Sequence, residues 1–508
     1  MIISVRRASF FRYPARLVIM ALALALAGCV VGPNFMHPAV PGEAGYVQHP
    51  LPSQIGGGTA GGRQTLTLDQ DIPAQWWTLF HSPVLNELVE AALKRNPDID
   101  AARAALRQAR ELSAAQRGFY YPNVSGELNP ARQKIASTLA SPASSAASYY
   151  TLNTSQLTVS FVPDVFGANR RQVESLDAQA ESQQFQLEAA KLTLASNVVV
   201  AAIQEASLRA QIDATRRLIE TQRKVLASFR RQLELGQAAQ TDVMAQEAQL
   251  AQTEAALPPL EKQLAQQRDL IAALAGRFPA EEIAAKFKLD SLKLPAHLPV
   301  SLPSKLVQQR PDIREADAQL HAASAQIGVA IANRLPNIQI LGTLGAATYF
   351  QNIGQASTNF WSIGAGLTQP IFDAGTLKHR QRAAEAAYEE AAAQYRSTVI
   401  TAFQNVADAL HAIVSDADEL RTAQNAENVA RRSLDVAQKR LALGDVGSLV
   451  VISAEQAWLQ ALLNRITAQT NRLSDSAGLL QALGGGWWND VNGEGELGKG
   501  KSSPGKSK

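Results

Sequence analysis

The chain has 508 residues, of which 46% are hydrophobic and only 6% aromatic. This composition is typical of a helical protein rich in Ala and Leu, and it argues against a dense β-sandwich. The formal net charge of +3 falls to about −1 when four arginines near the N-terminus are removed, namely Arg6, Arg7, Arg12 and Arg16. A chain without a basic surplus predicts no nucleic-acid partner.

Residues 1–28 have the layout of a cleaved secretory signal peptide, with a positive start and an apolar run from Leu17 to Leu26. That run is too short to span a bilayer. Cys29 is the only cysteine, which excludes a disulfide within the chain. The tetrad Leu26-Ala27-Gly28-Cys29 resembles a bacterial lipobox, which implies that Cys29 is acylated as the mature N-terminus. A stray cysteine in an ordinary signal is the alternative. Val30, where many lipoproteins retained in the inner membrane carry Asp, favours the outer membrane.

Residues 29–85 are expected to form a lipidated tether and an equatorial segment. The tether is rich in Pro and Gly as far as Gly62, a composition typical of extended or flexible chain. Beyond it, Trp76, Trp77 and Phe80 are expected to pack the start of a helix. An apolar stripe at helical spacing predicts that this helix runs from about 86 to 117.

Two segments, 119–163 and 336–370, change from the helical period to alternation and are predicted to be β-hairpins. In the first, Leu157 and Val159 alternate with Thr158 and Ser160. Aromatic residues near the strand ends are typical of a β-barrel in lipid, although a soluble hairpin would show the same pattern. Four strands of about ten residues cannot close, and an open sheet edge is not tolerated in lipid. Closure therefore requires further copies: two would suffice, and three would give a twelve-stranded barrel wide enough for a passage.

Two long stretches, from Ala168 to Leu235 and from Thr376 to Leu443, contain neither Gly nor Pro and end at Gly236 and Gly444. At about 1.5 Å per residue each helix would be roughly 100 Å long, several times the ~30 Å core of a bilayer. Neither is expected to be a simple membrane span. The second carries a heptad seam typical of supercoiled helices, formed by Val399, Phe403, Val406, Leu410, Ile413, Ala417 and Leu420.

The common plan of the two halves predicts an internal duplication. We expect repeat 1 at 86–276, a linker at 277–304 and repeat 2 at 305–484. In each repeat a returning helix, 242–275 or 449–483, is about half as long as its partner, and the helix at 86–117 or 305–334 supplies the rest. The Gly-, Ser- and Lys-rich tail at 485–508 is expected to be disordered.

Several motifs together resemble outer-membrane factors of the TolC type, in the lipoprotein branch that includes OprM and NodT. They are Cys29 with Val31-Gly32-Pro33, Trp76-Trp77-x-x-Phe80, Asp164-Val165-Phe166-Gly167, Pro370-Ile371-Phe372, and the returns after Gly236 and Gly444. The resemblance covers nearly the whole mature chain.

This resemblance implies a mainly α fold with a membrane β-barrel. A homotrimer would form a twelve-stranded barrel, continuous with a periplasmic α-barrel that is constricted at its inner tip. It implies the exit duct of a tripartite efflux system that exports small molecules or drugs. The implied partners are a periplasmic adaptor (membrane fusion) protein, an inner-membrane pump of the RND type and outer-membrane lipids. A duct for type I protein secretion or for metal efflux is the alternative function.

The inner tip is the candidate gate. Part of the family carries two acids at the sixth and ninth residues after the second tip glycine, where this chain has Val450 and Ser453. Asp445 is the nearest replacement, unless it is an ordinary turn aspartate. We also expect Asp242 to pair with Lys439 or Arg440 and to latch the helices closed. Alternatively these basic side chains only stabilise their helix ends.

An enzyme and a coiled-coil scaffold are the competing classes. The sequence has no Gly-rich phosphate loop, nucleophile elbow or His-Glu-x-x-His cluster, so we predict neither catalytic residues nor a cofactor. The exported leader and the paired strands argue against a scaffold. Met36 and Met244 are the only methionines of the mature chain, which disfavours a soft-metal relay and leaves organic compounds as the expected substrates.

Overall fold

The structure is a computed structural model that describes residues 30–39, 45–47, 52–56, 62–134, 149–281, 283–351 and 354–489. The predicted signal peptide, the lipidation site Cys29 and the tail from residue 490 onward lie outside the described residues. The chain forms two compact units. Unit 1 contains residues up to 38, 106–182 and 316–395, and unit 2 contains 39–105, 183–315 and from 396 onward.

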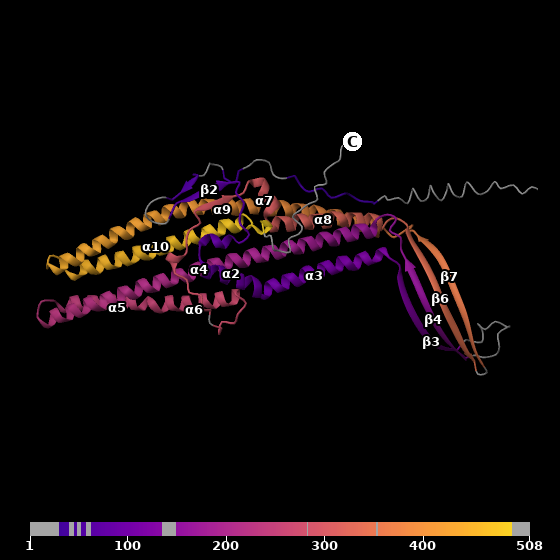
Figure 1. Cartoon of the computed structure of the whole chain (residues 1–508), viewed down its shortest axis with the longest axis horizontal. Coiled ribbons are helices and arrows are strands. Elements are labelled where there is room, and N and C mark those ends of the chain that lie inside the picture. The colour runs from indigo at the N-terminus through magenta and orange to yellow at the C-terminus, as the bar shows by residue number, and fades with distance from the viewer. Residues whose placement is uncertain are drawn as a thin grey trace, which may run out of the picture. The chain divides into compact units, whose positions relative to one another are not determined.

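Unit 1 is built on a four-stranded antiparallel sheet in the order β3-β4-β6-β7 (Figure 1). The strands are β3 (Asn123–Lys134), β4 (Tyr149–Phe161), β6 (Asn337–Gln351) and β7 (Gly354–Thr368). They lie within the two hairpin segments expected from the alternation and are longer than ten residues. Each hairpin comes from one half of the chain, so the pairing of β4 with β6 joins the halves. β3 and β7 stand at the two edges of the sheet.

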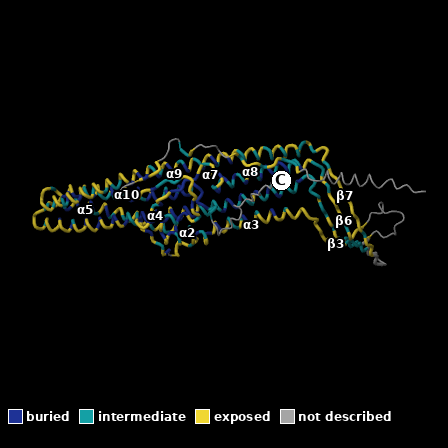
Figure 2. Tube along the Cα trace, turned by 45° about the horizontal axis from the view of Figure 1, so that its top comes forward, coloured by how far each residue is buried: buried dark blue, intermediate teal, exposed yellow. Residues whose placement is uncertain are grey.

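The two faces of this sheet differ in chemistry. One register row crosses all four strands with hydroxyl side chains, Ser125, Thr158, Thr343 and Ser362. The next row, which points to the opposite face, is Gly126, Leu157, Leu344 and Trp361. Its three large side chains are exposed in the single chain, and no described helix or strand covers this sheet (Figure 2). An exposed apolar face opposite a hydroxyl-rich face is the arrangement of a sheet between lipid and water.

Helices α3 (Pro97–Arg117) and α8 (Pro311–Ala332) lead toward the strands, and α3 is followed by the short 3₁₀ helix η2 (Gly118–Tyr120). After each hairpin an aspartate caps the next long helix, α4 (Ala168–Glu234) or α9 (Thr376–Ala442). Asp164 accepts hydrogen bonds from the backbone N–H groups of Asn169 and Arg170, both at 2.9 Å. Asp373 accepts from Gly375 and Leu377 at 2.9 and 2.8 Å, and these bonds lower the pKa of its carboxyl.

Unit 2 contains a small sheet of β1 (Gln54–Ile55), β2 (Gln64–Leu68) and β5 (His297–Val300), with β2 in the centre. The segment 29–85 therefore contributes two strands, of which β1 falls within the part expected to be a tether and β2 just after it. The expected linker contributes β5 and the 3₁₀ helix η3 (Leu289–Ser291). The 3₁₀ helix η1 (Trp76–Phe80) buries Trp76 and Phe80 almost completely. As expected, these aromatic residues lie just before a helix, α2 (Pro83–Arg95), whose N-cap is Ser82.

The single helices expected at 86–117 and 305–334 are each broken in two, which corrects the prediction. The first is α2 followed by α3, and the second is α7 (Pro303–Gln309) followed by α8. Asn96 and Arg310 adopt extended backbone conformations at the breaks because a proline follows each of them. The Asn96 side chain donates to the Leu274 carbonyl at 3.0 Å, and Arg310 donates to the Ala482 carbonyl at 2.7 Å. Each break therefore satisfies the end of a returning helix.

The returning helices are α5 (Gln240–Ala255) with α6 (Leu257–Leu274) in repeat 1, and α10 (Ser448–Ala482) in repeat 2. The helix expected at 242–275 is thus interrupted at Ala256, just before Pro258 and Pro259. Except for the half-buried Phe403, the side chains of the predicted heptad seam on α9 are buried. α4 contains a stretch apolar enough to cross a membrane by composition, but half of that stretch is buried within the chain.

The start of the tail was predicted wrongly, because residues 485–489 pack onto unit 2 and end in the 3₁₀ helix η4 (Trp487–Asn489). The Trp487 indole donates to the Gln309 carbonyl at 2.7 Å, and Asn489 donates to the Ile72 carbonyl at 2.8 Å. Gly485 and Gly486 have positive φ and touch neighbouring atoms closely, so the glycines permit close packing here instead of disorder.

Candidate gate at the helical tip

The tip of unit 2 consists of two helical hairpins, α4 with α5 and α9 with α10, whose turns lie at the same end (Figure 1). Gly236 and Gly444 stand just after the long helices with φ of 66° and 75°. In the first turn the Gln237 N–H donates to the Gln232 carbonyl at 2.8 Å, and in the second Asp445 donates to Arg440 at 2.9 Å. Both are Schellman-type ends, which require a left-handed residue and therefore favour glycine.

Each hairpin holds a small apolar cluster directly behind its turn. Leu226, Phe229 and Val243 form the first cluster, and Leu434, Ala437 and Val451 form the second. Corresponding members are 208 positions apart, the same displacement that separates Gly236 from Gly444. The duplication is therefore preserved residue by residue at the tip. Leu441 of α9 packs against both clusters and so joins the two hairpins.

The expected ion pair between Asp242 and Lys439 or Arg440 is not formed among the described residues of one chain. Asp242 instead accepts a hydrogen bond from the Ser448 hydroxyl at 2.9 Å, between the first turns of α5 and α10. Arg440 pairs with Asp445 at 2.8 Å within its own turn. The left-handed turn returns Asp445 to the last turn of α9, so Arg440 has a partner five residues away. Lys439 is exposed.

The positions of the family's tip acids are occupied differently here, since Val450 is exposed and apolar and Ser453 is exposed and uncharged. Both hairpins also expose apolar side chains close to their turns. These side chains are Leu235, Met244, Leu443, Leu449 and Val450. Asp445, which the sequence suggested as a replacement acid, is the acidic residue of the second turn, and its charge is shared with Arg440.

Behind the apolar clusters lies a buried polar layer that the sequence analysis missed. It contains Gln222 of α4 and Glu455 of α10, both 0% exposed, and Gln246 of the adjoining α5 is 1% exposed. Gln222 donates to one Glu455 carboxyl oxygen at 3.3 Å. Burial raises the pKa of Glu455, and the hydrogen bond from Gln222 opposes that shift. A sequence signal existed, because Glu455 is the only charged residue between Ser448 and Asn464.

The segment that follows Cys29 is fixed to unit 1, although its composition predicted a tether. The Val31 N–H donates to the Phe166 carbonyl at 3.2 Å, where β4 has ended and α4 is about to begin. The buried Arg171 donates to the Val31 and Gly32 carbonyls and to the Asn34 side chain, at 2.9–3.3 Å. A Cβ atom on Gly32 would lie 2.4 Å from the Cα atom of Gly328, so only glycine permits this approach. The described chain is therefore held at this junction from Val31 to Asn34.

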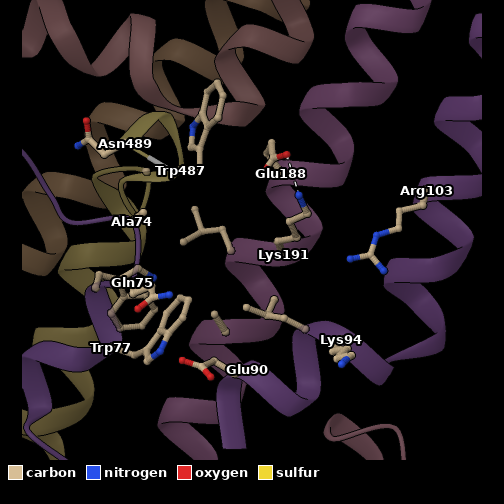
Figure 3. A pocket seen from close by; sticks show the side chains of 16 residues that line it. Ala74, Gln75, Trp77, Glu90, Lys94, Arg103, Glu188, Lys191, Trp487 and Asn489 are labelled. Carbon is tan, nitrogen blue, oxygen red and sulfur yellow. Dashed lines mark hydrogen bonds and ion pairs between the residues drawn. The ribbon is translucent and has the colours of Figure 1, made fainter. Parts of the chain in front are cut away.

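Unit 2 also contains a pocket of about 470 Å³ beside Trp76, Trp77 and Trp487 (Figure 3). One side carries the ion pair of Lys191 with Glu188, at 2.9 Å. None of the sixteen residues described as lining it is Ser, Thr, Cys or His, so it offers no nucleophile paired with a histidine base. Within the described part of the chain, no group of three or more His, Cys, Asp or Glu residues could hold a metal ion.

Comparison with known proteins gives consistent matches over most of the chain. A family profile described as outer membrane efflux protein matches residues 88–277 and 302–485. The pyoverdine export outer membrane protein OpmQ of Pseudomonas putida is 29% identical over 452 residues, covering 87% of this chain and 95% of that protein. The toluene efflux pump outer membrane protein TtgF of Pseudomonas putida is 28% identical, with coverages of 92% and 96%. The outer-membrane channel OprN is 26% identical with a TM-score of 0.77, covering 90% of this chain and all of that one.

Proposed function

This chain belongs to the outer membrane efflux protein family, and from that premise we propose that it works as a lipid-anchored homotrimer whose helical tip is gated. Its place as an outer-membrane efflux channel follows from the family and from the solved channels of the same fold. The proposed assembly receives substrate from a periplasmic adaptor and an inner-membrane pump of the RND class.

The observation that carries the trimer is the pair of sheet edges, β3 and β7, in a sheet with one apolar face. Each unpaired backbone group in lipid is unfavourable by several kcal/mol, so the edges must pair with other copies. Two chains would give the smallest known barrel, with a side-chain-filled interior, whereas three give twelve strands and space for cargo. Native mass spectrometry of the detergent-extracted protein should give three copies. A stable dimer or a monomer would contradict the proposal.

The lipid anchor is supported by the lipobox-like sequence and by the fixed segment after it. Val31, two residues after Cys29, is hydrogen-bonded to Phe166 between β4 and α4, so the chain that follows the proposed anchor is held in unit 1. One acyl chain alone anchors a protein only weakly, so the barrel supplies most of the attachment. Mass spectrometry of the mature N-terminus should show acylation of Cys29, and an unmodified N-terminus would contradict the anchor.

The proposed substrates are small organic molecules. The names of the relatives record pyoverdine export and toluene efflux, which are properties of those proteins. In this chain the support comes from the sparse methionine and the absence of a metal cluster among the described residues. Crosslinking in living cells, followed by purification of the tagged full-length protein, should recover an adaptor and an RND-class transporter. Recovery of a transporter of another class would contradict this assignment.

The proposed gate is the part of the contact between the two hairpins that lies nearest the turns, formed by Leu441 and by the bond between Asp242 and Ser448. A duct between periplasm and exterior has to stay closed when no pump is engaged. A direct hydrogen bond to a charged group is worth about 1.5–3 kcal/mol, and an exposed ion pair about 0–1. The half-buried Asp242–Ser448 contact is therefore the stronger candidate, and the exposed Arg440–Asp445 pair shapes its own turn.

A further inference from the structure

Glu455 is anomalous for its position in the chain. It is 0% exposed, and fully buried glutamates are rare unless they are paired with a cation. Two polar atoms of the bonded pair lack a further hydrogen-bond partner in the described structure, the second carboxyl oxygen of Glu455 and the amide oxygen of Gln222, and the buried amide nitrogen of Gln246 lacks one too. They come from α10, α4 and α5, so the layer lies where one hairpin meets the other.

The duplication supplies a direct comparison. Glu247 stands 208 positions before Glu455 and has the same place relative to its turn glycine. Glu247 is exposed and pairs with Arg230 at 2.7 Å. The counterpart of Arg230 in the second repeat is Gln438, so Glu455 has lost this cation as well as contact with water. The same residue is thus an ordinary surface acid in one hairpin and a buried acid in the other.

Charged side chains on the neighbouring helices do not replace the lost cation. On α4, Arg223 pairs with Glu254 of α5, and Lys224 pairs with Glu220. On α9, the charged residues on either side of the buried Leu434 are all exposed, namely Arg431, Arg432 and Asp435. α10 itself carries no other charge from Ser448 to Asn464. The raised pKa of Glu455 has burial as its largest cause, and no charged group contributes.

We propose that Glu455 is a proton-binding site that holds the two hairpins together as a neutral acid and releases them when it ionises. A neutral carboxyl can donate to the Gln222 amide oxygen while it accepts from the Gln222 amide nitrogen, which gives both unpartnered oxygens of this pair a hydrogen bond. An ionised carboxyl can only accept, and it is solvated best when the hairpins separate. This inference rests on the proposed function, because it requires that the tip opens.

The direction of the pH effect follows from the raised pKa. The closed packing binds the proton more tightly than an opened, hydrated layer does. Closure is therefore favoured at low pH and is lost as the pH rises through the raised pKa of the buried acid. Each unit of pKa difference between the two forms changes the closed-to-open ratio by up to about tenfold.

Conductance of the full-length protein in planar bilayers, at about pH 5.5 and about pH 8, tests the proposal because this range spans the shifts of buried carboxyls. The parent should conduct several-fold more at the higher pH. Glu455→Gln, which keeps the shape and stays neutral, should remain closed at both, while Glu247→Gln should respond like the parent. A parent-like pH response of Glu455→Gln would overturn the proposal. If no variant conducts, the proposed channel function fails instead.

A second measurement does not depend on how well Glu455→Gln assembles. Glu247→Gln keeps Glu455 and removes its exposed counterpart. Infrared spectra of this variant, prepared with carbon-13-labelled glutamate, should show the carbonyl band of the protonated Glu455 at low pH, and the band should disappear as the pH rises. The label separates glutamates from buried aspartates, and the other buried glutamate, Glu205, differs from Glu455 because it is paired with Arg209 at 2.6 Å. If this band is missing at about pH 5.5, where exposed glutamates are ionised, Glu455 is not the neutral acid proposed.

Discussion

Placing a charge on the apolar face of the sheet provides the sharpest test of the membrane assignment. Leu157 lies on the exposed apolar row, four residues before the end of β4. Thr158, its neighbour, lies on the hydroxyl row of the opposite face. An outward arginine near the bilayer midplane destabilises a β-barrel by about 2–4 kcal/mol, whereas a lumen-facing one costs far less. Since a trimer carries three copies, Leu157→Arg should destabilise the assembly by roughly 6–12 kcal/mol.

Depth provides an internal control for this experiment. Val159 is also on the apolar face but is two residues closer to the end of β4, so Val159→Arg should be milder than Leu157→Arg. The yields of detergent-resistant trimer should rank Leu157→Arg lowest, Val159→Arg intermediate, and Thr158→Arg close to the parent. Equal yields of Leu157→Arg and Thr158→Arg would refute the assignment of the two faces.

Three further predictions concern the helical part and the N-terminal segment. Burial, together with a hydrogen bond to Asp475, raises the pKa of Asp416 to about 7. The contribution of Asp416 to stability should therefore be fully present below about pH 4 and be lost as the pH rises through 7. Thermal unfolding of Asp416→Asn should lack that decline, and an unchanged pH profile would contradict it. Arg171→Gln leaves the Val31 and Gly32 carbonyls without their donor, and each lost hydrogen bond should destabilise the segment by about 1–3 kcal/mol. Protease should therefore cleave the N-terminal segment faster than in the parent. Equal cleavage rates would be evidence that this segment is not fixed. Ser448→Ala removes the hydrogen bond to Asp242 and should raise the conductance of the channel by about fivefold for each ~1 kcal/mol by which closure is weakened. Asp445→Ala removes only an exposed ion pair and should conduct like the parent. The opposite order of conductance would exclude the Asp242–Ser448 contact as the gate.

Much of the fold could be predicted because short stretches of sequence determine where the helices end and where the strands lie. Gly236 and Gly444 end their helices as expected, since the left-handed turn they form is a property of a few consecutive residues. The hairpins were found from strict alternation. The breaks at Asn96 and Arg310 were missed even though Pro97 and Pro311 were visible, because the apolar stripe continues through both of them. Two helices stacked end to end can show the same apolar periodicity as one continuous helix, so the periodicity alone does not reveal the break.

The site was less predictable because its contacts join residues that are far apart in the sequence. Arg440 could reach several acids, and only the turn geometry selects Asp445 over Asp242. Trp487 and Asn489 lie in a stretch whose glycines suggested disorder, yet the buried carbonyls of Gln309 and Ile72 bind them. Glu455 was overlooked because a single acid in an apolar helix is ordinarily turned toward water, and nothing local shows that Gln222 covers it.

The apolar clusters behind the turns determine what kind of motion the tip can make. Each cluster ties the end of a long helix to the start of its own return helix, within a few residues of the turn. The two helices of a hairpin therefore cannot separate at the turn without exposing the side chains of its apolar cluster to water. If the tip opens as proposed, each hairpin is therefore expected to move as one rigid piece, with its turn, its cluster and both helix ends together.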